Sequence, residues 1–168
     1  MSSASVAQLE NTERNRAGST PWNSALLLRF VLAAIAVLIC YCFHWHWLRF
    51  LTSEANLRVD ALLGLQMQRL SSDTILWNGM LYKYENACTF ADVWCAAIPL
   101  IWNLRKSFTS NLSLLAWFTP VLFVFNIFRL SASDFFFSTG IPWMWAHEFV
   151  GGCAYFLVWV WIWRNRSW

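Results

Sequence analysis

The chain has 168 residues and a formal net charge of +3, with 58% hydrophobic and only 12% charged residues. Soluble domains usually carry about 25% charged residues, so this composition excludes an ordinary soluble domain and indicates lipid as the solvent. The 13 Trp and 14 Phe agree with this, because aromatic rings gather where membrane meets water. No basic run is interleaved with aromatic residues, and we expect no nucleic-acid partner.

The chain begins with residues 1–23, a polar segment that we expect to be a disordered cytoplasmic tail. We expect residues 24–168 to form one transmembrane helical domain. Its first apolar run extends from Ala25 to about Trp47, and the bulky residues at its end predict an uncleaved anchor rather than a secretory signal. In the mixed segment Leu48–Ala87, apolar residues between positions 62 and 70 partly follow helical spacing. That spacing predicts an amphipathic helix at the membrane interface.

Three further apolar segments follow, at about residues 88–104, 111–130 and 143–163. Twenty residues of helix are about 30 Å long, which matches the hydrocarbon core of a bilayer. The predicted fold is therefore all-α, a polytopic membrane bundle with about four transmembrane helices plus an interfacial helix. By the positive-inside rule, the basic residues flanking these segments predict that both termini are cytoplasmic and that the protein is multi-pass in the inner (plasma) membrane. These residues are Arg14, Arg16, Arg105, Lys106, Arg164 and Arg166.

Three polar residues fall at the same predicted membrane face, although each belongs to a different span. Cys88 opens the second span, Arg129 closes the third, and His147 lies near the outer end of the fourth. At these positions we expect the helix dipole to favour a thiolate at Cys88, a cation at Arg129 and a neutral imidazole at His147. A nucleophile, a fixed cation and a proton shuttle are the groups that acyl transfer needs, and this face is predicted to be extracytoplasmic.

Other polar residues are weaker candidates. Asn126 lies one turn before Arg129 on the same helix face and is positioned to orient it. Asp92 and Glu148 are candidate partners for the arginine or the histidine, and Glu85 is a further candidate residue of the site. His44 and His46 are two residues apart and point to different sides of a helix, so we expect no metal site and no cofactor.

The residues around Cys88, Arg129 and His147 resemble the three motifs of the exosortase/archaeosortase family of membrane-embedded cysteine transpeptidases. The segments are Ala87-Cys88-Thr89, Asn126-Ile127-Phe128-Arg129 and His147-Glu148-Phe149-Val150-Gly151, in the order that the family shows. The family commonly has Ser and Gly after the cysteine, where this chain has Thr89 and Phe90. It often has Glu two residues before the cysteine, where this chain has Asn86, with Glu85 one residue further back.

This resemblance implies a transpeptidase or endopeptidase that processes exported proteins carrying a C-terminal sorting tail with a transmembrane helix. Cys88 would form a thioester with the substrate, Arg129 would stabilise the oxyanion and His147 would move the proton. The product would be anchored at the cell surface or released, often in connection with exopolysaccharide, by transfer to an acceptor nucleophile that is unknown. The alternatives from the residues alone are a non-catalytic membrane assembly protein and a four-span thiol oxidoreductase.

Overall fold

The structure, a computed structural model, describes residues 22–165, which are mostly helical, as the sequence predicted. All but the last two residues of the predicted cytoplasmic tail lie outside the described residues. Five α-helices are joined by a short 3₁₀ turn, a π-helical turn and a small sheet. They are α2 (Trp22–Tyr41), α3 (His46–Leu62), β1 (Gln68–Arg69), β2 (Thr74–Trp77), β3 (Met80–Lys83), η1 (Asn86–Thr89), α4 (Ala91–Ile101), α5 (Phe108–Ser138), η2 (Met144–Phe149) and α6 (Val150–Asn165).

Two helices are long and apolar enough to cross a membrane by length and composition, namely α2 over Ser24–Tyr41 and α5 over Phe108–Ser138. Only 11% of the α2 window and 33% of the α5 window is buried, unlike the core helix of a soluble protein. The second predicted span is shorter than expected. It forms α4, whose 11 residues are about 16 Å long, about half of a hydrocarbon core.

The segment between α2 and α4 differs most from the sequence prediction. The first apolar run does not continue to Trp47, because α2 ends at Tyr41 and α3 begins at His46. The helix predicted from the leucines between positions 62 and 70 is wrong, since α3 ends at Leu62 and a three-stranded antiparallel sheet in the order β1-β2-β3 follows. Asn78 and Gly79, with φ of 50° and 77°, form the two-residue turn that pairs β2 with β3.

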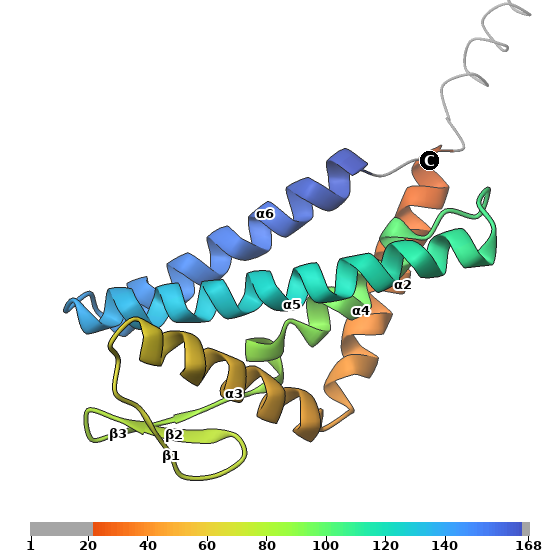
Figure 1. The fold of residues 1–168 in the computed structure, drawn as a ribbon. Coiled ribbons are helices and arrows are strands. Elements are labelled where there is room, and N and C mark those ends of the chain that lie inside the picture. The colour runs from red at the N-terminus through yellow and green to blue at the C-terminus, as the bar shows by residue number, and fades with distance from the viewer. Residues whose placement is uncertain (1–21, 166–168) are drawn as a thin grey trace, which may run out of the picture.

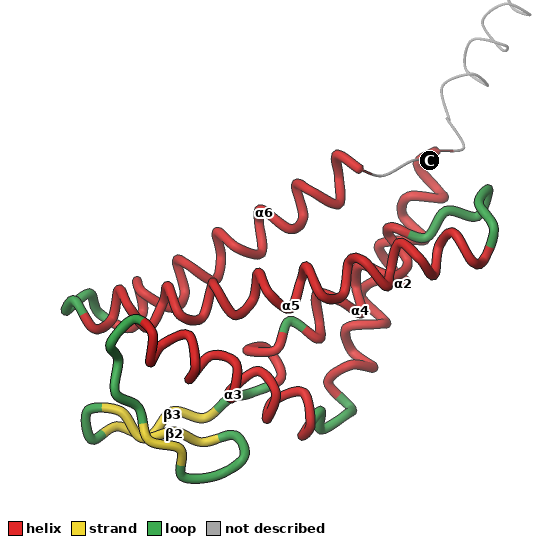
Figure 2. The backbone as a smooth tube through the Cα atoms, viewed as in Figure 1, coloured by secondary structure: helices red, strands yellow, loops and turns green. Residues whose placement is uncertain are grey.

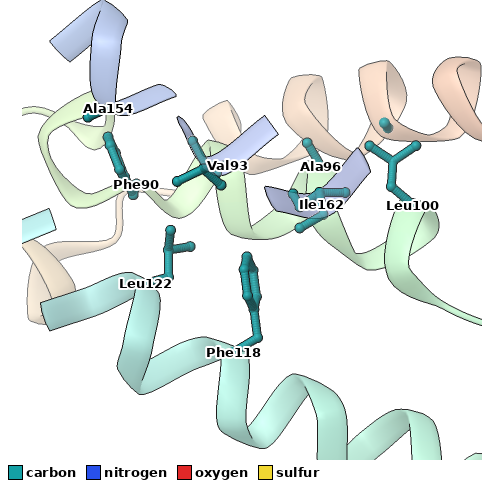
Figure 3. Close-up of a cluster of buried hydrophobic side chains, with 11 residues drawn as sticks. Phe90, Val93, Ala96, Leu100, Phe118, Leu122, Ala154 and Ile162 are labelled. Carbon is teal, nitrogen blue, oxygen red and sulfur yellow. The ribbon is translucent and has the colours of Figure 1, made fainter. Parts of the chain in front are cut away.

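Helix α5 runs through the molecule and contacts α3, α4 and α6 (Figure 1). Helix α4 lies against α2, and α6 lies beside α5, while α3 packs on the C-terminal part of α5 with the sheet below it (Figure 2). Side chains of α2, α4, α5 and α6 meet in one apolar cluster around Phe90, Phe118 and Leu122 (Figure 3). Ala96 and Ala97 in α4 are small enough to bring its backbone close to α2.

Helix α3 has a polar inner face and an apolar outer face. Its buried side chains are Arg49, Thr52, Ser53, Asn56 and Asp60. By contrast Trp47, Phe50 and Leu62 on the same helix are exposed. This reverses the usual pattern of a helix on a water-soluble protein and means that α3 is held on α5 by polar contacts.

Candidate functional site

Cys88 lies in η1, the 3₁₀ turn that leads from the sheet into α4. Its backbone N–H donates to the carbonyl oxygen of Glu85 at 3.0 Å, which closes the turn. Its own carbonyl oxygen accepts a hydrogen bond of 2.8 Å from Nδ2 of Asn126 in α5. Asn126 is fully buried, so this bond fixes the cysteine-bearing turn against the middle of α5.

The same asparagine holds Arg129. Nε of Arg129 donates to Oδ1 of Asn126 at 3.2 Å, and the guanidinium lies 4.8 Å from the centre of the Phe90 ring. The expected position of Arg129 at a helix C-terminus is wrong, because α5 continues to Ser138. The guanidinium of Arg129 is therefore held in its buried position by Asn126 and Phe90, and the helix dipole does not contribute.

The arginine has a free donor and a close backbone neighbour. Nη2 of Arg129 is buried without a hydrogen-bond partner among the described residues. On the other side, a Cβ added at Gly151 would lie 3.2 Å from Nη1. The glycine of the third motif therefore leaves room for the guanidinium.

His147 belongs to η2, the π-helical turn that precedes α6. Its ring stacks on Trp143 with 4.6 Å between centroids and 16° between planes. Oε1 of Glu148 lies 3.5 Å from Nδ1, and Nδ1 is buried without a hydrogen bond to the described residues. Glu148 itself is largely exposed.

A cavity of about 620 Å³ connects these elements. Cys88 and His147 both line it, together with Asp134 from α5 and residues of β2 and β3. Arg129 does not line the cavity, but Asn126 ties it to the turn that carries Cys88. The structure thus brings the three predicted residues to one region of the molecule, from three separate elements.

Sequence reasoning missed the acidic side of this cavity. Nδ2 of Asn56 lies 2.8 Å from Oδ2 of Asp134 and 2.7 Å from Oδ2 of Asp60. Burial and the neighbouring Asp134 carboxyl group raise the pKa of Asp60 to about 8, so that Asp60 keeps its proton at neutral pH. The hydroxyl of Tyr84 also contacts Nδ2 of Asn56, at 3.0 Å, and burial raises the pKa of Tyr84.

The sequence-based expectation is a thiolate at Cys88, whereas its buried position acts against ionisation. Burial raises the pKa of the Cys88 thiol, although the backbone contact with Glu85 and the positive charge of Arg129 act in the opposite direction. A thiol in this setting becomes a nucleophile only with a base, and the imidazole of His147 lines the same cavity.

The weaker candidates lie at different places. Asp92 accepts hydrogen bonds from the hydroxyls of Tyr41 at 3.2 Å and Tyr155 at 3.1 Å, so its carboxylate is engaged by two tyrosines. Glu85 is exposed and takes part in η1 through its backbone carbonyl.

Outside the cavity, His44 and His46 stack with 5.7 Å between ring centres. Within residues 22–165, no group of three or more His, Cys, Asp or Glu side chains is arranged to hold a metal ion. No family model, curated protein or solved structure matches this chain.

Proposed function

We propose that this protein is a membrane cysteine transpeptidase or endopeptidase of the exosortase/archaeosortase type. The observation that supports it best is a pair of buried nitrogen atoms near the cavity that Cys88 lines, Arg129 Nη2 and His147 Nδ1, which form no hydrogen bond within residues 22–165. Buried polar atoms are nearly always paired, so unpaired ones near a nucleophile indicate atoms that a substrate engages. Arg129 belongs to the second motif that resembles the family, and His147 belongs to the third.

The proposed reaction uses these groups in order. His147 removes the proton from the Cys88 thiol, and the sulfur attacks a backbone carbonyl carbon of the substrate. The oxygen becomes an oxyanion and accepts a hydrogen bond from Nη2 of Arg129. The C–N bond then breaks, the leaving amine takes the proton from His147, and an acyl thioester stays on Cys88. An amine or water attacks this thioester and restores the thiol.

The proposed setting is a bilayer crossed several times by the chain, with the cavity on the extracytoplasmic side. Arg105 and Lys106 lie in the turn between α4 and α5 and Arg164 lies in the last turn of α6, at the basic end of the molecule where α2 begins, while the sheet and η2 lie toward the other end (Figure 1). By the positive-inside rule, the basic end faces the cytoplasm. The exposed apolar surfaces of α2, α5 and α6 would then contact lipid. The partners are exported proteins with a hydrophobic C-terminal tail.

The test is processing of such proteins. Exported proteins from the same genome that end in a hydrophobic helix and basic residues are co-expressed with the enzyme, and loss of the tail is followed by mass. We expect Cys88→Ala to abolish processing while the protein still inserts into the membrane. Cys153→Ala is the matched control, because Cys153 is an exposed thiol on α6 away from the cavity, and it should process normally. Normal processing by Cys88→Ala would refute catalysis and favour a membrane assembly protein.

A further inference from the structure

The strand β3 has a free edge beside the cavity. The sheet order is β1-β2-β3, so β3 has a paired neighbour on one side only. In an antiparallel pair, the backbone groups of successive residues point alternately toward the partner strand and away from it. The N–H of Tyr84 donates to the carbonyl of Asp73 at 2.7 Å, which continues the pairing of β3 with β2.

This bond fixes the direction of every residue in β3. Counting back by two from Tyr84, the backbone groups of Tyr82 and Met80 also face β2, as expected for the pair Trp77 and Met80 that closes a two-residue turn. The N–H and C=O groups of Leu81 and Lys83 therefore point away from β2. No described residue forms a backbone hydrogen bond with them.

The free edge is continuous with the cavity that holds Cys88 and His147. All four residues of β3 line that cavity, including Leu81 and Lys83, whose side chains project from the opposite face of the sheet to Tyr82. The cavity therefore extends to the edge of the strand. Its volume of about 620 Å³ is within the range of ligand sites, which is roughly 300–1,000 Å³.

We propose that β3 is the docking strand for the substrate, which binds as an extended peptide that adds a fourth strand to the sheet. This inference rests on the proposed function and names how that site holds its substrate. Main-chain hydrogen bonds to Leu81 and Lys83 give affinity that does not depend on sequence, and side chains at alternate positions give specificity. The aromatic rings of Tyr82, Phe137 and Trp143 line the cavity and select apolar side chains for the positions that face inward.

The chain order explains why the peptide ends at the nucleophile. Four residues separate Lys83 from Cys88, and the turn η1 brings the thiol into the same cavity. A peptide paired with β3 is immobile beside Cys88, so its carbonyl is held for attack rather than found by free diffusion. A folded or helical substrate segment does not offer the unpaired backbone groups that this edge requires.

The test removes one backbone donor without changing the fold. Leu81→Pro removes the N–H that points away from β2, and proline is tolerated at such positions of edge strands. Leu81→Ala is the matched control, because it removes the same side chain and keeps the N–H. With the reporter proteins of the processing assay, we expect kcat/KM of Leu81→Pro to be at least tenfold lower than that of Leu81→Ala, mainly through KM.

Two further measurements separate the possible failures. The alkylation rate of Cys88 by iodoacetamide should be the same in Leu81→Pro and the original protein, which shows that the cavity is intact. If Leu81→Pro keeps full processing while Cys88→Ala has none, the docking strand is refuted and the proposed function stands. If Cys88→Ala processes normally, the proposed function itself fails, whatever the behaviour of Leu81→Pro.

Discussion

Phe90 joins the cysteine-bearing turn to α4 with a backbone that an aromatic residue rarely adopts. Its φ of 56° and ψ of 20° lie in the left-handed region, which costs residues other than glycine about 1–2 kcal/mol. Its ring compensates for this cost, since it is only 1% exposed and packs 4.7 Å from the ring of Tyr155 and 4.8 Å from the guanidinium of Arg129. The exosortase/archaeosortase motif that this segment resembles commonly has glycine at this position, which this backbone would favour.

Two substitutions separate the backbone from the ring. Phe90→Ala removes the ring and keeps the strain, and large-to-small changes of this kind cost about 3–5 kcal/mol. Phe90→Gly removes the ring and also relieves the strain, so we expect it to be about 1–2 kcal/mol more stable than Phe90→Ala. In a right-handed helix the order is reversed, because glycine is roughly 0.5–1 kcal/mol worse than alanine. Whether Phe90→Gly is more or less stable than Phe90→Ala therefore shows whether residue 90 has a left-handed or a right-handed backbone.

The assay is unfolding by heat or sodium dodecyl sulfate in detergent micelles, followed by far-ultraviolet circular dichroism. Ala97→Gly is the matched control, because Ala97 is buried in the right-handed helix α4 and should be destabilised by the change. The reasoning is refuted if Phe90→Gly is less stable than Phe90→Ala. Both variants should also slow processing, since Arg129 loses the ring beneath it.

Three other predictions follow from the described contacts. Because the pKa of Asp60 is raised to about 8 in the folded protein and is about 4 when unfolded, folding stability should be greatest below pH 4 and fall as pH rises toward 8. Asp60→Asn mimics the protonated acid and should flatten this dependence in pH-resolved melting curves. Arg29 donates to the carbonyls of Pro99 at 3.1 Å and Trp102 at 2.8 Å at the end of α4, so Arg29→Leu should cost about 2–3 kcal/mol in the same unfolding assay, and no loss would contradict the capping role. A membrane-impermeant maleimide applied to intact cells should label Ser72→Cys, beside β2, and spare Ser110→Cys; the reverse pattern would overturn the orientation.

The parts that sequence reasoning located well were those carried by local chemistry. A thiol, an arginine and an imidazole on three apolar segments predicted that Cys88, Arg129 and His147 would meet, and in the structure Cys88 and His147 line one cavity with Arg129 next to it. The positions of α2 and α5 follow from long apolar runs. The dipole argument for Arg129 failed, because it depends on a helix end that the sequence does not mark: α5 runs nine residues past Arg129.

The sheet was missed although a signal for it was present. Asn78-Gly79 between apolar residues is the strongest short-range indication of a hairpin, and it outweighs an incomplete helical spacing of leucines such as Leu62 and Leu63. The acidic residues Asp60 and Asp134 had no such signal. They are 74 positions apart in the sequence, and only the packing of α3 on α5 brings them to the same asparagine.

That packing also explains why the cavity depends on polar contacts. Lipid tails are as apolar as the side chains of a helix, so apolar burial does not favour one packing of two membrane helices over another. Hydrogen bonds and close fit between the helices then determine how they pack. Asn56 supplies these contacts by joining Asp60, Asp134 and Tyr84, the last of which directly follows β3. The hydrogen bonds of Asn56 therefore hold α3 on α5 and also tie the end of β3 to both helices. Loss of the Asp60 proton would add negative charge to this buried cluster, so we expect its hold on α3, α5 and the residue after β3 to weaken as pH rises toward 8.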